Sequence, residues 1–214
     1  MNPATRGWVA VALAVALGTG CTSATASMAG AGTPMTAAAL QTTLNTLFQE
    51  HVYLAAAATG AALGGRQAEF QAAAAALDQT SLVIAQAVGL VYGADAEKAF
   101  LPLWRRHIGF VVDYTVGLAG RDKAKQEQAV GALLGYTDEL GNFLASANPH
   151  LSRAAVADLV KHHILTLKEV IDAQAAGDAP RAYRALRAAA GHMQGIATPL
   201  AQAIVKQFPD RFRS

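Results

Sequence analysis

Apolar residues recur at spacings of three and four along most of the chain after residue 36, which predicts amphipathic helices rather than strands. Residues that favour helix ends divide this region, namely glycines suited to a left-handed terminal residue and Asp or Ser side chains suited to an N-cap. We therefore expect an all-α fold of six helices, over about residues 36–63, 66–92, 95–120, 122–148, 152–177 and 178–207. Pro102 and Pro199 fall inside two of these helices, where we expect a kink or a restart.

An internal repeat with a constant offset of 56 residues relates three segments, 47–52, 103–108 and 159–164. Each segment lies on the first helix of a predicted helix pair, so we expect three helical hairpins that together form an antiparallel six-helix bundle. In every copy a histidine lies in the middle of the apolar stripe, because residues three, four and seven positions apart share one face of a helix. These histidines are His51, His107 and His163.

The hairpin turns predict which residues face each other, because two positions on antiparallel helices lie at one height when they are equally far from the turn. This measure gives three facing pairs: His51 with Asp78, His107 with Tyr136, and His163 with His192. Apolar neighbours at helical spacings indicate that Asp78 and His192 also point inward. We therefore expect all six side chains in one polar layer at the middle height of the bundle.

Such a layer concentrates groups that are costly to bury, since a carboxylate needs a counter-charge or a metal and an imidazole needs hydrogen-bond partners. A bound cation offsets this cost, and imidazole with carboxylate suits Cu, Zn or Fe. One ion cannot reach every member of the layer. We expect a four-ligand subset, His107, His163 and His192 with either His51 or Asp78, and Tyr136 beside the ligands.

Three alternatives to a metal site stay open at this point. The layer can be a satisfied polar network, in which the histidines pair with Asp78 and Tyr136 and only set the register of three similar hairpins in an envelope module. Two opposed histidines can also hold haem without a covalent link. An enzyme that uses a metal-bound water is a third alternative. The chain has no Glu-x-x-His pair, no Cys-x-x-Cys-His and no His-Glu-x-x-His, so di-iron carboxylate, c-type haem and zincin motifs are absent from the sequence.

Composition supports the helical prediction and narrows the partners. Nearly a quarter of the chain is alanine, 53% of residues are hydrophobic and 15% are charged. The formal net charge is +2 and no dense basic run occurs, so we expect no nucleic-acid partner. Trp104, Phe110 and Phe143 are interpreted as core residues.

The N-terminal part predicts export. No charged residue follows Arg6 until Glu50, and the apolar run of residues 8–17 is too short to span a bilayer, as in a signal peptide. We expect a lipoprotein-like signal peptide over residues 1–21, with lipidation of Cys21 as a membrane anchor, a flexible tether over residues 22–35 and the helical domain over residues 36–214. Cleavage after residues 24–26, Ala-Thr-Ala, is the alternative, and either product lies outside the cytoplasm, in the periplasm or outer envelope.

Two strings, LWRRHIGFVVDYT at residues 103–115 and AIVKQFP at residues 203–209, resemble a largely uncharacterised group of exported bacterial helical proteins. The resemblance covers about residues 40–212, and some longer relatives carry copper-amine-oxidase-like names. It implies an all-helical module outside the cytoplasm and assigns no catalytic residue.

Overall fold

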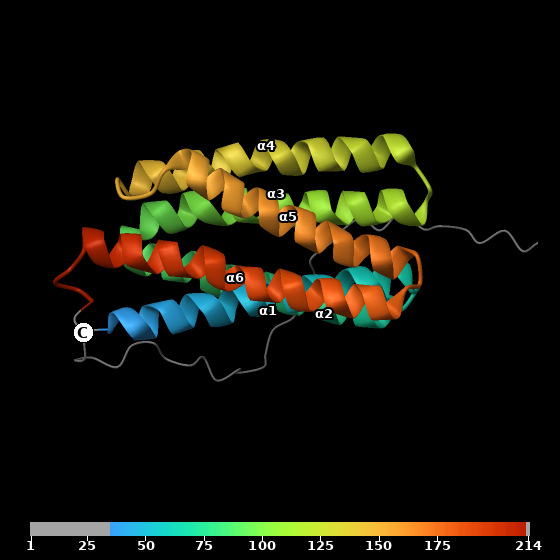
Figure 1. The fold of residues 1–214 in the computed structure, drawn as a ribbon, viewed down its shortest axis with the longest axis horizontal. Coiled ribbons are helices and arrows are strands. Elements are labelled where there is room, and N and C mark those ends of the chain that lie inside the picture. Colours follow the sequence, from blue (N-terminus) through green and yellow to red (C-terminus); the bar gives the residue numbers. More distant parts are fainter. Residues whose placement is uncertain (1–34, 213–214) are drawn as a thin grey trace, which may run out of the picture. The chain divides into compact units, whose positions relative to one another are not determined.

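The computed structural model describes residues 35–212, which form six α-helices without a β-strand in that range (Figure 1). The helices are α1 (Ala37–Leu63), α2 (Gln67–Tyr92), α3 (Ala94–Ala119), α4 (Lys123–Ala147), α5 (Arg153–Ala175) and α6 (Ala179–Gln207). The predicted all-α, six-helix fold is confirmed. Cys21 and the predicted signal peptide and tether lie outside the described residues, apart from Met35.

Short polar side chains begin four of the helices. Thr36, Asp122, Ser152 and Asp178 each accept a hydrogen bond from the backbone N–H three residues further on. This satisfies one of the N–H groups that the first turn of a helix leaves without a partner. Glycines lie at the C-terminal ends of several helices. Of these, Gly65 (φ +69°) and Gly177 (φ +71°) adopt the left-handed conformation.

The helices form a closed ring in which consecutive helices pack side by side and α6 returns against α1. The odd-numbered helices α1, α3 and α5 also contact one another across the interior. They therefore lie closer to the bundle axis than α2, α4 and α6. This arrangement contains the three predicted hairpins, whereas the 56-residue relation between them stays a prediction.

Alanine and branched aliphatic side chains fill the half of the interior toward the α1–α2 turn. Ala55, Ala58 and Ala61 of α1 pack there, and Val170 and Ile171 of α5 are buried at the same end. Because alanine is small, the helices approach closely and this half of the interior is well filled.

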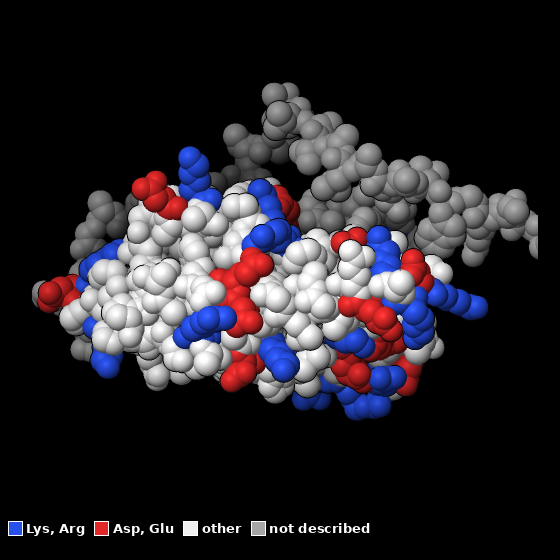
Figure 2. All heavy atoms as spheres, turned by 90° about the horizontal axis from the view of Figure 1, so that it is seen from above, with Lys and Arg blue, Asp and Glu red and all other residues white. Residues whose placement is uncertain are grey.

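Ion pairs join neighbouring helices on the outer surface, where acidic and basic side chains lie beside one another (Figure 2). Arg153 on α5 pairs with Asp138 on α4, for example, at 3.0 Å. Exposed pairs of this kind contribute about 0–1 kcal/mol each, so the buried helix faces supply most of the stability.

Candidate metal centre

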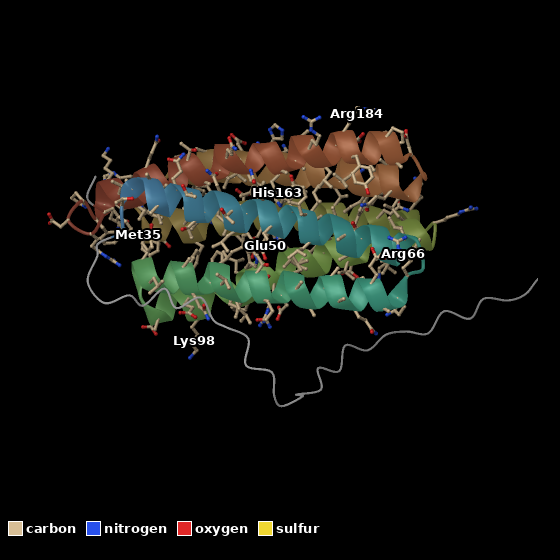
Figure 3. The ribbon with its side chains drawn as sticks, turned by 90° about the horizontal axis from the view of Figure 1, so that it is seen from below. Met35, Glu50, Arg66, Lys98, His163 and Arg184 are labelled. Carbon is tan, nitrogen blue, oxygen red and sulfur yellow. The ribbon has the colours of Figure 1, made fainter. Side chains whose placement is uncertain are left out.

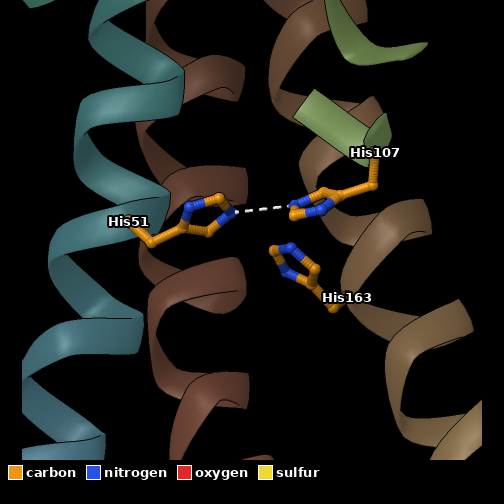
Figure 4. Close-up of side chains that lie close together, drawn as sticks. All are labelled: His51, His107 and His163. Carbon is orange, nitrogen blue, oxygen red and sulfur yellow. Dashed lines mark hydrogen bonds between the residues drawn. The ribbon is translucent and has the colours of Figure 1, made fainter. Parts of the chain in front are cut away.

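Three histidines from separate hairpins converge at the centre of the bundle. His51 on α1, His107 on α3 and His163 on α5 are 2%, 3% and 7% exposed, respectively. Figure 4 shows their imidazole rings pointing toward one another, and Figure 3 shows His163 midway along the bundle. The Nε2 atoms of His51 and His107 are 3.4 Å apart, and one ring nitrogen of each histidine lies within 4.8 Å of the others.

The inner position of the odd-numbered helices explains why these rings meet. Each histidine lies near the middle of its helix, on the stripe that faces the bundle axis. Since α1, α3 and α5 contact one another, side chains at this height project into the same small volume. The predicted inward direction of the three repeat histidines is confirmed.

The spacing of the nitrogens suits one metal ion. Two nitrogen ligands at 2.0–2.1 Å from zinc, separated by the tetrahedral angle, lie about 3.4 Å apart. His51 and His107 already have this separation. One ring nitrogen of His163 lies within 4.8 Å of a nitrogen of each of them, so an ion bound by all three requires His163 to come closer.

Several polar atoms of the centre have no partner. Among the described residues, Nδ1 of His51 and of His163, Nε1 of Trp104 and the hydroxyl of Tyr136 are buried and form no hydrogen bond. An unpaired buried polar group costs about 1–3 kcal/mol, and most such groups in proteins are satisfied. The Nε2 atoms of His51 and His107 lie within hydrogen-bond distance of each other, so the described residues satisfy the polar groups of the centre only in part.

Burial keeps the three imidazoles neutral. It lowers the pKa of His107 to about 3, with the nearby His163 adding to the shift and the backbone carbonyl of Trp104 opposing it. Burial likewise lowers the pKa of His163 to about 3, helped by His51 and His192, and lowers the pKa of His51 well below 6.5. Neutral imidazole is the form that binds a metal, so the centre is ready for a cation at neutral pH.

Two aromatic residues hold the histidine rings in place. The indole of Trp104 lies 4.7 Å from the ring of His107, edge to face, and 5.0 Å from the ring of His51. Tyr136 on α4 stacks on His107 at 4.9 Å. The predicted position of Tyr136 beside the histidines agrees with this contact. Trp104 is a core residue, as predicted, and its i, i+3 spacing to His107 could have indicated its place at the centre.

The structure places the other two predicted ligands elsewhere. Asp78 on α2 forms a two-bond ion pair with Arg105 at 2.7 and 2.8 Å, and its side chain is 46% exposed. His192 on α6 has Nε2 3.0 Å from the carbonyl oxygen of Leu159 and stacks on His162 at 4.0 Å. The expectation that Asp78 and His192 point inward is wrong, because α2 and α6 lie further from the axis. The carboxylate of Glu50, next to His51 in the chain, faces α2 and accepts a hydrogen bond from Thr80.

A cavity of about 640 Å³ adjoins the centre, and all three histidines line it together with Trp104 and Tyr136. Its other walls are mostly aliphatic. The sequence did not predict this cavity, because a pattern of apolar positions does not distinguish a filled interior from a hollow one.

Comparison with protein-family models, curated proteins and solved structures finds no match to the chain. Its function is therefore inferred from this geometry.

Proposed function

We propose that the protein binds one transition-metal ion through His51, His107 and His163. The observation that carries the proposal is the approach of three buried, neutral imidazoles from three hairpins, with two Nε2 atoms 3.4 Å apart. Three protein ligands leave a fourth tetrahedral position for water or another small ligand. The cavity adjoins the histidines and gives this position access to a ligand.

Zinc and copper fit the donor set best. Imidazole suits Zn, Cu, Fe and Ni, whereas non-haem Fe(II) sites commonly add a carboxylate to two histidines. Within the described residues, the cluster of possible metal ligands contains histidines alone. Haem between two histidines is less compatible, because the Nε2 atoms of His51 and His107 lie within hydrogen-bond distance of each other and a third imidazole lies beside them.

The test is the metal content of the full chain, purified without chelator and without affinity metal. We expect close to one zinc or copper ion per chain, or stoichiometric uptake when Zn²⁺ or Cu²⁺ is added. His107→Ala should lose this binding. His162→Ala is the matched control, because His162 is exposed and stacks on His192 away from the three-histidine centre. Equal metal binding by the wild-type chain and His107→Ala would refute the proposal.

We further propose that the metal is bound outside the cytoplasm, by a protein tethered to a membrane through Cys21. The support comes from the sequence, which has an uncharged apolar stretch near the N-terminus and a single cysteine after it. A segment made mostly of small residues, glycines among them, then precedes the first helix. Cys21→Ser should release the protein from the membrane fraction without altering metal binding. A Cys21→Ser variant that sediments with membranes as the wild type does would contradict the anchor.

A further inference from the structure

The cavity is long and runs along the bundle axis. Its walls follow α1 from Leu40 to His51, a rise of about 16 Å at 1.5 Å per residue. The volume of about 640 Å³ falls within the range of about 300–1,000 Å³ that is usual for small-molecule sites. Between its ends it is lined by aliphatic side chains, such as Leu44, Val88 and Leu140.

The inner end of the cavity is polar and the outer end is open. At the inner end Trp104 contacts His51 and His107, and Tyr136 stacks on His107; the indole N–H and the phenol hydroxyl have no partner among the described residues. The exposed lining residues all lie on the α4–α5 loop, the first turn of α5 and the end of α6. They are Pro149, His150, Ser152, Ala155, Gln202 and Lys206.

The charges of the residues that line the cavity indicate which class of ligand it can bind. Among the described residues that line the cavity, Lys206 at the mouth is the one with a permanent charge, and none is acidic. Lys206 attracts anions to the mouth and repels cations. At the inner end, the N–H of Trp104 and the hydroxyl of Tyr136 can donate hydrogen bonds, and a metal on the histidines accepts an oxygen ligand.

We propose that the cavity binds a long-chain carboxylate, with its head at the three-histidine centre and its alkyl chain toward the α4–α5 loop. This inference rests on the proposed metal site, because the carboxylate takes the fourth coordination position. With carbon–carbon bonds of about 1.5 Å in a zigzag, a saturated chain of about ten to twelve carbons matches the length of the cavity. The aliphatic walls shield that chain from water.

The opposite orientation, with the alkyl end against the histidines, is disfavoured. It would leave the buried hydroxyl of Tyr136 and the indole N–H of Trp104 without partners, and such groups are costly when unpaired. Entry of the head first brings a hydrogen-bond acceptor to the end of the cavity that both residues line.

Dodecanoate is the probe for this proposal, and the fluorescence of Trp104 reports its binding. The full chain with Trp8→Phe contains Trp104 as its one remaining tryptophan. We expect saturable binding of dodecanoate by the zinc-loaded protein below micellar concentrations, with a change in Trp104 emission. Acetate tests the head alone, and dodecyltrimethylammonium tests the same chain with a cationic head. Neither should bind at the concentration that saturates with dodecanoate, and equal binding of the cationic probe would overturn the proposal.

Two neighbouring alanines provide a matched pair of variants. Ala154 and Ala155 are both exposed in the first turn of α5, but Ala155 alone lines the cavity. Ala155→Phe should obstruct the mouth and weaken dodecanoate binding about tenfold or more, whereas Ala154→Phe should not. Both variants should bind zinc as the wild type does. Unchanged dodecanoate binding in Ala155→Phe would refute the proposed site.

Zinc binding is measured on the same samples, which separates the two proposals. Zinc uptake without dodecanoate binding refutes the ligand proposal and leaves the metal site intact. Dodecanoate binding without zinc uptake refutes the metal site and, with it, coordination of the head.

Tyr136→Phe tests the orientation of the ligand. This change should weaken dodecanoate binding about tenfold through loss of a hydrogen bond to a charged group, without loss of zinc. An unchanged affinity in Tyr136→Phe would place the head elsewhere and overturn the proposed orientation.

Discussion

At the scale of single residues, the notable feature of the centre is that its cluster of possible metal ligands within residues 35–212 holds three buried imidazoles and no carboxylate. Desolvation disfavours their charged forms, and each histidine would repel a proton on its neighbour. They are therefore neutral in the folded protein at any pH near neutrality. This state is favourable for binding a metal and unfavourable for stability in acid.

The first prediction concerns this acid sensitivity in the metal-free protein. In the unfolded chain the three histidines take up protons below about pH 6.5, whereas in the folded chain His107 and His163 do so only near a pKa of about 3. Between these values the unfolded state holds more protons, so stability falls as pH falls. Well inside this window the loss is on the order of 4 kcal/mol per pH unit for three histidines. Denaturant unfolding in the presence of a chelator, between pH 5 and 6, measures it.

A second prediction separates the stability of the centre from its ability to bind metal. His163→Leu removes a buried imidazole whose Nδ1 has no partner and replaces it with an apolar side chain, so the metal-free protein should be as stable as the wild type or more stable. Its acid dependence should fall by about one third, because one of three histidines is gone. Added zinc should no longer raise its melting temperature. A clear destabilisation of the metal-free variant at neutral pH would contradict this account of the centre.

At the scale of helices, the ends were predictable because they depend on local chemistry. Asp122, Ser152 and Asp178 cap α4, α5 and α6 where the sequence places helix starts. The height of each polar residue was also predictable from its distance to a turn. The distance of each helix from the bundle axis was not, because it depends on how six helices pack together. For this reason His163 on an inner helix reaches the centre, whereas His192, at the same predicted height on α6, does not.

The two prolines show a second limit of local reasoning. Pro102 and Pro199 lie inside uninterrupted helices, so the expected restart does not occur. Proline removes one backbone hydrogen bond, but the apolar faces before and after it are buried in the same bundle. Packing of the whole helix therefore outweighs the local loss.

A pair of glycines in α4 tests how closely the helices approach. A Cβ on Gly141 would lie 2.7 Å from the backbone oxygen of Arg153 on α5, whereas a Cβ on Gly135 would meet nothing within 4 Å. We expect Gly141→Ala to destabilise the protein by about 1–3 kcal/mol, because the backbone of α5 must move. Gly135→Ala should stabilise it by up to about 1 kcal/mol, since alanine is the better helix former. Thermal or denaturant unfolding measures both, and equal effects of the two changes would contradict the close approach of α4 to α5.

At the scale of the whole molecule, the proposed metal site joins parts of the chain that are far apart. The three histidines proposed as ligands come from the three hairpins, which are also joined by apolar packing, exposed ion pairs and side-chain hydrogen bonds such as that from Thr59 to Gln174. A metal ion that binds all three ligands favours only those states in which the hairpins are assembled. It therefore couples ligand binding to global folding rather than to one helix.

The last prediction follows from this coupling. Zinc at a free concentration of about 100 times its dissociation constant should stabilise the folded protein by about 3 kcal/mol, which raises the melting temperature by roughly 5–10 °C for a chain of this size. Differential scanning calorimetry with zinc and with chelator measures the shift. His51→Leu, His107→Leu and His163→Leu should each abolish it, whichever hairpin carries the change. His192→Leu should retain it, because the ring of His192 lies against Leu159 and His162 outside the centre. Loss of the shift in only one of the three variants would mean that the ion is held by one hairpin, and the proposed three-histidine site would then be wrong.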